Sequence, residues 1–399
     1  MTVPLSLPAA QALLLDPVMP LPAEPIAAAD AAGRYLAAGV TARRTQPAAD
    51  LSAMDGYAMR ADDLAGPWTI TGESAAGHPF QGNVRPGEAV RVSTGSLVPH
   101  DAGAVLLQED ATRDGERVSL SGGGSPSPRH IRRAGFDFRA GDVLLEAGTR
   151  MGPAQIALAL SGSNADLQVH ALPSVWVIDS GDELTADPTV SAPHQIPASN
   201  GAMLSAMVAP FVRSVQRIGP VADRLADLTA AFAKAGSADV IVTSGGASLG
   251  DHDLIRPALE AWGAKISFWR VAMRPGKPLL VARKGGATVV GLPGNPVSSY
   301  VTAFFFVLPL LRRLAGAREP LPIAVAGKLA RALPAGGART EFVRASLAGE
   351  WVTPLGEQDS SALRTLAAAD ALIERPAGAA AADAGSVVPV YRLENGGAA

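Results

Sequence analysis

One stretch of this chain, residues 240–298, restricts the possible folds more than any other. It contains short apolar runs at 240–242, 266–271 and 288–290, with a helical apolar pattern between the first two runs. Strands that alternate with helical segments are typical of a parallel α/β sheet, whose ligands gather at the carboxyl ends of the strands. We therefore expect an α/β domain with its functional site in the loops that follow these runs.

Three loops in this stretch carry residues suited to anion binding. Residues 244–253 read SGGASLGDHD, and adjacent glycines let successive backbone N–H groups approach and cradle a phosphate. Residues 274–278 read RPGKP, in which two prolines and a glycine fix a turn that presents Arg274 and Lys277. Residues 291–298 read GLPGNPVS. The alternative is that these are ordinary turns whose charges are solvated.

Acidic residues accompany these loops. Asp251 and Asp253 close the first loop, and Asp182 and Glu183 follow a further apolar run at 174–178. Because carboxylates repel phosphate, this arrangement favours a divalent cation between acid and phosphate. Two acids at the carboxyl end of a strand can hold Mg²⁺ or orient a nucleotide hydroxyl.

Small polar residues also precede a helical pattern at 199–201, which reads SNG. Serine and asparagine are favoured N-cap residues, so Ser199 or Asn200 is expected to cap the helix. A contact between one of these side chains and a ligand is the alternative, and the sequence leaves both open.

Composition excludes several classes of function. The 399 residues suffice for about two to four domains, and a net charge of −3 gives no general attraction to nucleic acid or acidic membranes. Cysteine is absent, which excludes disulfides and thiol catalysis and fits a cytoplasmic location. The longest apolar run, 300–311, is too short to span a bilayer. The six histidines lack metal-ligand spacing, and neither a Walker loop nor a G-x-S-x-G elbow is present.

The remaining segments predict a multidomain chain. We expect two helices within residues 5–40, separated by a proline-rich stretch, and β structure at 68–108. A helix within 144–169 is expected to rejoin the N-terminal helices, which would make the middle β region an insertion. From 321 to 391, short alternating strands indicate a small β domain.

Taken together, the loops 244–253, 274–278 and 291–298 resemble the molybdopterin molybdenumtransferase family, which includes bacterial MoeA and the E domain of gephyrin-like proteins. Further matching motifs are SAMDGYA at 52–58, RVSTGS at 91–96, DSGDEL at 179–184, RTEFVR at 339–344 and QDSSAL at 358–363. The matches run in roughly the family's order and spacing from about Ser52 to Leu366.

Two places depart from the family pattern. Residues 130–137 correspond to the family's N-x-R-x-x-G-E-D, but His130 replaces asparagine and Phe136 replaces glutamate. The second change removes a charge and a hydrogen-bond acceptor, which leaves the segment's part in substrate or dimer contacts open. Asp359 stands where the family usually has glycine. An acid facing an oxyanion would weaken its binding, so we expect Asp359 to face water.

The resemblance implies a fold that combines α/β and β domains. It consists of a discontinuous helical linker region (1–45 and 138–172), an inserted β domain (46–137), a MogA-like α/β domain (173–317) and a C-terminal β-barrel (318–395). It also implies a homodimer whose active site is shared between subunits.

The activity implied by the resemblance is the insertion of molybdate into adenylylated molybdopterin, with Mg²⁺-dependent release of AMP, giving molybdenum cofactor. Further partners implied are the pterin-adenylylating protein and proteins of molybdoenzyme maturation. A phosphate-bearing substrate and an oxyanion together require a glycine cradle, acids that hold Mg²⁺ and a basic pocket.

Roles for single residues follow from the same resemblance. The implied catalytic residues are Asp55, Glu183, Asp223, Asp253 and Lys277. The implied substrate-binding residues are Thr94, Asp137, Asp182, Ser244, Gly245, Gly246, Ser248, Pro293, Asn295 and Pro296. Molybdate would be held by Arg274, Lys277, Ser298, Arg339 and Ser360, and Mg²⁺ by Asp182, Glu183 and Asp253. Asp55 and Thr94 would reach in from the other subunit.

Two rival functions remain open. The first is a binding scaffold without catalysis, since gephyrin-like relatives use this fold to anchor proteins and Phe136 would mark such a copy. The presence of Asp253, Lys277, Arg339 and Ser360 favours an enzyme. The second rival is an enzyme that only adenylylates the pterin, and release of AMP rather than consumption of ATP would separate the two.

Overall fold

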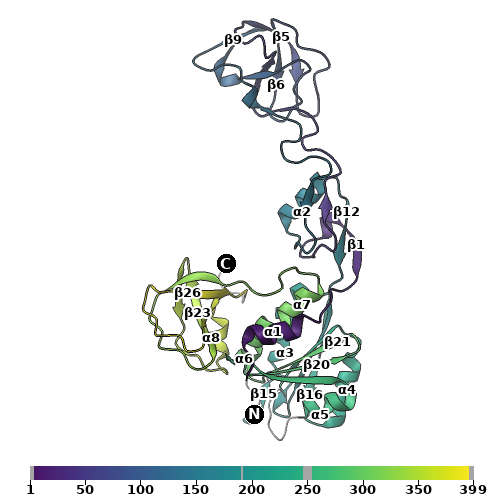
Figure 1. Ribbon diagram of the computed structural model, residues 1–399, viewed down its shortest axis with the longest axis vertical. Coiled ribbons are helices and arrows are strands. Elements are labelled where there is room, and N and C mark those ends of the chain that lie inside the picture. The colour runs from purple at the N-terminus through teal and green to yellow at the C-terminus, as the bar shows by residue number, and fades with distance from the viewer. Residues whose placement is uncertain (1–3, 190–191, 246–253, 395–399) are drawn as a thin grey trace.

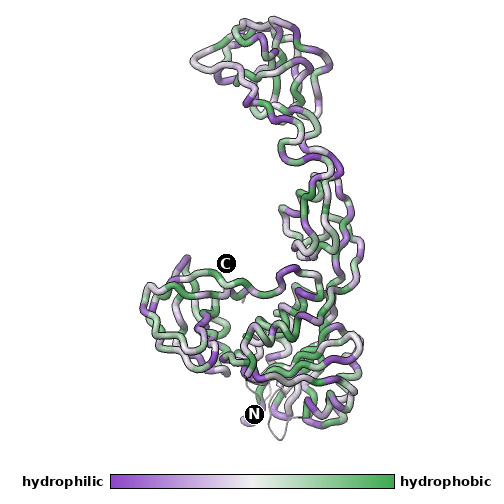
Figure 2. Tube along the Cα trace, in the orientation of Figure 1, coloured by the Kyte–Doolittle hydropathy of each residue, from purple (hydrophilic) through white to green (hydrophobic). Residues whose placement is uncertain are grey.

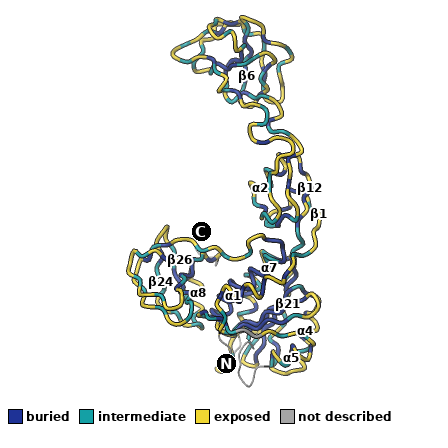
Figure 3. Tube along the Cα trace, in the orientation of Figure 1, coloured by how far each residue is buried: buried dark blue, intermediate teal, exposed yellow. Residues whose placement is uncertain are grey.

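The computed structural model describes residues 4–189, 192–245 and 254–394. Figure 1 shows an elongated molecule, with one β domain at one end, a narrow segment in the middle, and an α/β domain beside a second β domain at the other end. Apolar residues concentrate on the inner strands of each domain in Figure 2, and the same strands are buried in Figure 3. The expected multidomain combination of α/β and β domains is confirmed. The four expected domain boundaries stay predictions.

Antiparallel strand pairs build the narrow segment. The pairs are β1 (Ala23–Ala27) with β12 (Asp166–His170), β2 (Val40–Thr41) with β11 (Val143–Leu145), and β3 (Leu51–Ser52) with β10 (Ile131–Arg132). The chain leaves along one strand of each pair and returns along the other. The middle β region is therefore an insertion, as the sequence predicts.

The expectation of two helices within residues 5–40 is wrong. Only α1 (Leu7–Leu15) is a helix in this fully described range, and the strand β1 and the 3₁₀ turn η1 (Ala28–Asp30) follow it. The prolines around β1 remove N–H donors that a helix needs. Leu36 and Val40 are instead buried in a small core beside α2 (Pro153–Ser161), the helix expected within 144–169.

The inserted domain is a six-stranded sheet in the order β7-β4-β6-β5-β9-β8. Its strands are β4 (Gly56–Met59), β5 (Trp68–Ser74), β6 (Glu88–Val92), β7 (Ala104–Leu107), β8 (Ala111–Asp114) and β9 (Arg117–Leu120). The short 3₁₀ turn η2 (Gln108–Asp110) connects β7 to β8, and η3 (Pro128–His130) leads into β10 of the narrow segment. Tyr57, Met59 and Trp68 contribute to a core of its own.

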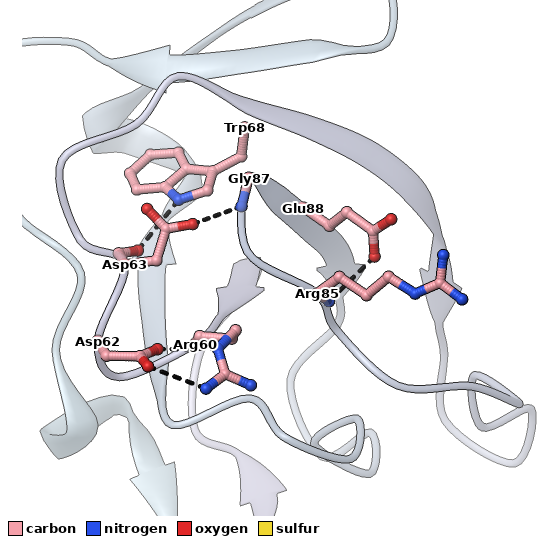
Figure 4. Close-up of polar contacts among 7 residues, drawn as sticks. All are labelled: Arg60, Asp62, Asp63, Trp68, Arg85, Gly87 and Glu88. Atoms are coloured by element: carbon pink, nitrogen blue, oxygen red, sulfur yellow. Dashed lines mark hydrogen bonds and ion pairs between the residues drawn. The ribbon is translucent and has the colours of Figure 1, made fainter.

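Polar contacts fix the turn that leads into β5 (Figure 4). Arg60 donates to both carboxylate oxygens of Asp62, at 2.8 and 2.9 Å. Asp63 accepts the Gly87 N–H through Oδ2 at 2.6 Å, and its carbonyl accepts from Nε1 of Trp68 at 3.0 Å. The buried indole is therefore both packed and hydrogen-bonded, which locks the turn onto the sheet.

The α/β domain holds a second six-stranded sheet, in the order β16-β13-β17-β21-β20-β18. The strands are β13 (Ser174–Ser180), β16 (Ser214–Val221), β17 (Val240–Ser244), β18 (Lys265–Arg270), β20 (Pro278–Lys284) and β21 (Ala287–Leu292). The first four in spatial order are parallel, as predicted, but β20 is antiparallel to both neighbours and was not foreseen. Because β20 reverses the direction twice, β18 ends at the same edge of the sheet as β17 and β21.

Helices cover both faces of this sheet. On one side lie α1, α3 (Asn200–Val208) and the helix made of α6 (Pro296–Thr302), η5 (Ala303–Val307) and α7 (Leu308–Leu314), and on the other lie α4 (Leu225–Ala235) and α5 (Ile255–Trp262). Val240 and Val242 face the first core while Ile241 faces the second, so β17 is buried on both faces. The short elements β14 (Leu184–Thr185), β15 (Ile196–Pro197) and η4 (Ala209–Phe211) complete the domain.

The continuous helix at 296–314 corrects the estimate made from the apolar run 300–311. It is 19 residues long and apolar enough to cross a membrane by composition. However, 83% of its most apolar window is buried inside the protein, where Leu310 and Leu311 belong to the main core. It is the core helix of the α/β domain.

The C-terminal domain is a closed five-stranded barrel, as expected. Its strands are β22 (Val325–Leu329), β23 (Thr340–Ala348), β24 (Trp351–Pro354), β25 (Ala371–Arg375) and β26 (Val387–Arg392), and α8 (Leu363–Ala367) lies between β24 and β25. The barrel closes because β23 pairs with both β24 and β25. The short strand β19 (Met273–Arg274) of the preceding domain pairs in parallel with β23, so hydrogen bonds join the two domains.

Candidate active site between the α/β domain and the barrel

A cavity of about 760 Å³ lies where the α/β domain meets the barrel. All three loops singled out in the sequence reach it, together with the loop after β13 and two barrel segments. The predicted site residues that line it are Glu183, Asp223, Gly245, Arg274, Lys277, Pro293, Asn295, Ser298, Arg339 and Ser360. Strand direction explains this meeting, because β13, β17, β18 and β21 all end at this edge of the sheet.

The two glycine loops touch one another behind the cavity. Ser244 pairs in register with Leu292, and the Gly245 N–H donates to the Leu292 carbonyl at 3.3 Å. Gly245 has a φ of +99°, and a Cβ at Gly294 would lie 3.8 Å from the Gly245 Cα. Glycine is required at 245 because few side chains adopt this backbone conformation.

Ser244 has a structural bond where a ligand contact was predicted. Its side chain is 4% exposed, and its Oγ accepts a hydrogen bond from Nδ2 of Asn200 at 2.8 Å. Ser199 occupies the N-cap of α3 but makes no side-chain capping bond there. Ser199 therefore holds the expected N-cap position, but neither the Ser199 nor the Asn200 side chain makes a capping hydrogen bond.

Basic residues form one wall of the cavity. Arg274 lies 3.5 Å from Glu341, and Arg339 donates to the Met273 carbonyl at 3.3 Å. Pairing of β19 with β23 brings these two arginines together from different domains. The ammonium group of Lys277 has no hydrogen bond or ion pair with any residue that the structure describes, although the backbone carbonyl of Lys277 accepts the Val271 N–H at 2.8 Å. Its ammonium group therefore remains available to an anion.

Asn295 ties this wall to the barrel. Its Nδ2 donates to Oγ of Ser360 at 2.9 Å, and the Val297 N–H donates to the Ser360 carbonyl at 3.1 Å. Pro296 begins α6, and Ser298 in its first turn is 6% exposed and lines the cavity. These bonds fix the barrel loop at the mouth of the α/β sheet.

Asp359 is exposed, as expected, although it belongs to the lining of the cavity. Its Oδ1 accepts bonds from the Ser361 N–H at 2.8 Å and the Ser361 hydroxyl at 2.6 Å. These bonds, aided by the charges of Arg344 and Arg274, hold the pKa of Asp359 below its usual value. The carboxylate is thus engaged by its own turn.

Arg344 is a residue that the sequence analysis did not single out. Only 1% exposed, it donates to the carbonyls of Glu357, Asp359 and Ala362 at 3.1, 2.9 and 3.4 Å. It therefore shapes the loop that carries Ser360. A signal was present, because residues two apart on a strand share a face, and Arg344 shares its face with the buried Phe342.

Acidic residues form another part of the cavity wall. The Asp223 N–H donates to Oδ1 of Asp182 at 3.0 Å, and Glu183 and Asp223 line the cavity, whereas Asp182 does not. Partial burial, followed by the nearby charges of Asp182 and Glu183, raises the pKa of Asp223. Such crowding of like charges is relieved by a cation or by protonation.

Carboxylate oxygens are the ligands that Mg²⁺ prefers, so the chemistry of this wall suits the expected ion. Within the described ranges, however, no group of three acid, histidine or cysteine side chains is arranged to hold a metal. Asp253, the third expected ligand, lies outside the described residues, as do Gly246 and Ser248. The magnesium site stays a prediction.

The predicted residues Asp55, Thr94 and Asp137 do not reach the cavity of their own chain. Asp55 accepts bonds from the Thr94 N–H at 2.6 Å and the Thr94 hydroxyl at 3.1 Å, and these bonds lower its pKa. Both residues belong to the inserted domain, at the opposite end of the molecule in Figure 1. Asp137 is exposed at the end of the narrow segment beside Phe136, whose ring is 74% exposed.

Comparisons with known proteins agree with this architecture. Family models described as the MoeA N-terminal region (domain I and II), a probable molybdopterin binding domain and the MoeA C-terminal region (domain IV) match residues 5–162, 176–313 and 326–393. The structure of a molybdopterin biosynthesis MoeA protein from Pyrococcus horikoshii OT3 superimposes with a TM-score of 0.83 at 24% identity, covering 98% of this chain and all of that one. This likeness shows a shared fold.

The chain is also similar in sequence to curated proteins. A molybdopterin molybdenumtransferase of Haemophilus influenzae is 36% identical over 294 residues, which cover 73% of this chain and 72% of the relative. Molybdopterin molybdenumtransferase 2 of Mycobacterium tuberculosis is 33% identical over 91% of this chain and 93% of its own length. The chain therefore belongs to the molybdopterin molybdenumtransferase family, a family of transferases in molybdenum cofactor biosynthesis.

Proposed function

We propose that this chain inserts molybdate into adenylylated molybdopterin and releases AMP in a Mg²⁺-dependent reaction. The observation that carries the proposal is a cavity lined by arginine and lysine side chains as well as by carboxylates. A tetrahedral dianion and a phosphoanhydride need these two environments at the same place. The cavity would therefore select its substrates by placing charged groups where the oxyanion and the phosphoanhydride bind.

The basic wall would hold molybdate. Arg274, Lys277 and Arg339 supply positive charge, and the hydroxyls of Ser298 and Ser360 supply hydrogen bonds to the oxyanion. Lys277 is the strongest candidate for direct contact because no described side chain neutralises it. Molybdate would bind to the pterin while water cleaves the phosphoanhydride and releases AMP, and no covalent enzyme intermediate is required.

The acidic wall would serve the nucleotide. Asp182, Glu183 and Asp253 would hold Mg²⁺, which supplies charge neutralisation at the phosphoanhydride. Asp223, whose pKa is raised, would retain a proton to a higher pH than an ordinary aspartate. Gly245, Gly246, Ser248, Pro293 and Pro296 would line the pterin phosphate or AMP portion of the substrate.

A second copy of the chain would complete the site. Asp55, Thr94 and Asp137 stand away from their own cavity, so the resemblance-based roles of these residues require a partner subunit. We propose a homodimer in which the inserted domain of each copy reaches the cavity of the other, in a cytoplasmic setting. The pterin-adenylylating protein and maturation proteins would then supply the substrate and receive the product.

The test is AMP release from adenylylated molybdopterin with Mg²⁺, in the presence and absence of molybdate. Wild type should release AMP only with molybdate, and both Lys277→Ala and Asp253→Ala should reduce the rate at least about a hundredfold. Lys328→Ala is the matched control, because Lys328 pairs with Glu350 on the far side of the barrel. Substrate binding without AMP release in wild type, even with excess molybdate, would contradict the proposal.

A binding scaffold is the second candidate, favoured by one observation. Phe136 exposes 74% of its surface at a position where the family usually has a glutamate. An exposed ring of this kind suits a protein contact. In the AMP assay, a scaffold would bind substrate and leave it intact.

A further inference from the structure

The side chain of Asn200 connects three parts of the α/β domain. Asn200 is the first residue of α3, and its Nδ2 donates to Oγ of Ser244 at 2.8 Å and to the carbonyl of Gly294 at 2.7 Å. An amide nitrogen carries two hydrogens, so both of its donors are used. One side chain thus bonds simultaneously to the last residue of β17 and to the loop after β21.

These bonds lie where the backbone ladder stops. β17 and β21 are parallel neighbours whose pairing ends at Ser244 and Leu292, with the Gly245 N–H and Leu292 carbonyl just beyond it. Past that point, no described backbone bond joins the two loops. Asn200 replaces the ladder with a side-chain bridge and thereby sets the distance between the Gly245 and Gly294 backbones.

The position of Asn200 is itself fixed by the packing of the next residue against β13. The next residue, Gly201, lies against the carboxylate of Asp179, which is 3% exposed and lies 3.8 Å from Arg217. A Cβ at Gly201 would collide with this carboxylate, so only glycine brings the helix this close to β13. This close packing holds the N-terminus of α3 against the end of β13.

The bridge stands behind the cavity rather than in it. Gly245 and Gly294 line the cavity, whereas Asn200 does not. Its amide therefore acts on a ligand only through the two loops. We propose that Asn200 is a positioning residue that holds the two glycine loops at the separation that the phosphate-bearing part of the substrate requires.

This inference rests on the proposed function for its kinetic consequence, but the bridge can be tested without turnover. Hydrogen exchange measured by mass spectrometry should be on the order of tenfold faster at residues 291–295 in Asn200→Ala, since two bonds are lost. Ser244→Ala removes one of the two acceptors and should give a smaller acceleration, about threefold. Ser199→Ala is the matched control, because the adjacent serine makes no side-chain capping bond, and it should exchange as wild type does.

Steady-state kinetics distinguish a positioning role of Asn200 from a general loss of stability. Asn200→Ala should raise KM for adenylylated molybdopterin on the order of tenfold, with kcat within about twofold of wild type and an unchanged requirement for molybdate. Asn200→Asp, which places an acceptor against the Gly294 carbonyl, should raise KM further. If Asn200→Ala lowered the melting temperature and lowered kcat by as large a factor as it raised KM, the positioning role would be overturned.

Two failures remain distinguishable. If wild type releases no AMP, the proposed function is wrong, and the exchange comparison alone judges the bridge. If exchange at 291–295 is the same in wild type, Asn200→Ala and Ser199→Ala, the inference about Asn200 is wrong whatever the activity.

Discussion

The two ends of the molecule differ in how their candidate site residues are arranged. At the α/β and barrel end, loops from two domains meet around a cavity, and the side chains of Asn295 and Arg344 hold the barrel loop that lines it. At the inserted end, Asp55 and Thr94 form a bonded pair that faces no cavity of its own chain. The difference teaches that motifs typical of one family can lie at opposite ends of the chain, far from the cavity that most of them line.

The first prediction tests whether the two ends are independent in stability. Phe305 packs against Phe342 and Tyr391, with ring centroids 4.2 and 5.0 Å apart, and so joins the core helix to the barrel. Phe305→Ala should lower the free energy of unfolding of this end by about 3–5 kcal/mol. Hydrogen exchange should accelerate across the α/β domain and barrel while the inserted sheet keeps its protection.

The matched variant is Trp68→Ala, which removes the largest buried side chain of the inserted core. It should accelerate exchange at 56–120 and leave residues 174–393 unchanged. If either variant destabilised both ends, the two ends would not be independent in stability.

The second prediction concerns the buried carboxylate beneath α3. Burial raises the pKa of Asp179 to about 6, although Arg217 and the Gly201 N–H act to lower it. Because the folded chain then holds this proton more tightly than the unfolded chain, the group destabilises the fold above pH 6, and that loss fades as pH falls toward 4. Asp179→Asn removes this dependence. The free energy of unfolding of Asp179→Asn minus that of wild type should therefore fall by roughly 2 kcal/mol when the pH is lowered from 8 to 4.

Denaturant unfolding of wild type and Asp179→Asn at the two pH values measures this change. An equal gap between Asp179→Asn and wild type at pH 8 and pH 4 would contradict the account of the buried charge.

The smallest effect is expected at the inserted end. Thr94→Val removes the hydroxyl that bonds to Asp55 but keeps the backbone N–H bond. The pKa of Asp55, followed by NMR, should rise toward its ordinary value while the melting temperature stays within error of wild type. An unchanged pKa would show that the hydroxyl contributes nothing to the pair.

Much of the cavity could be predicted from the sequence because strand direction is a strong constraint. Apolar runs buried on both faces predict parallel strands, and parallel strands place their following loops at one edge. The strand β20 escaped because it follows the RPGKP turn directly and reverses the direction of the chain, which no periodicity records. The meeting of three loops survived this error, since two reversals restore the direction of β18.

Other features depend on long-range packing that local patterns do not contain. The alanine-rich stretch after residue 27 looks helical, but its apolar side chains fit a small core built by strand pairing with residues more than a hundred positions away. The helical length of 296–314 was underestimated because the apolar run stops before the helix does. The bridge by Asn200 joins residues 44 and 94 positions apart, so only the fold reveals it.

The shared site proposed for two copies is tested most directly by mixing two inactive variants. Lys277→Ala damages the cavity end, and Asp55→Ala damages the inserted end, so each variant alone should release almost no AMP. If subunits exchange, half of the dimers in an equal mixture are mixed, and one of their two sites is intact. The account predicts recovery of about a quarter of wild-type AMP release, by this counting and the symmetry of a closed dimer. No recovery after verified subunit exchange would contradict it and place Asp55 outside the site.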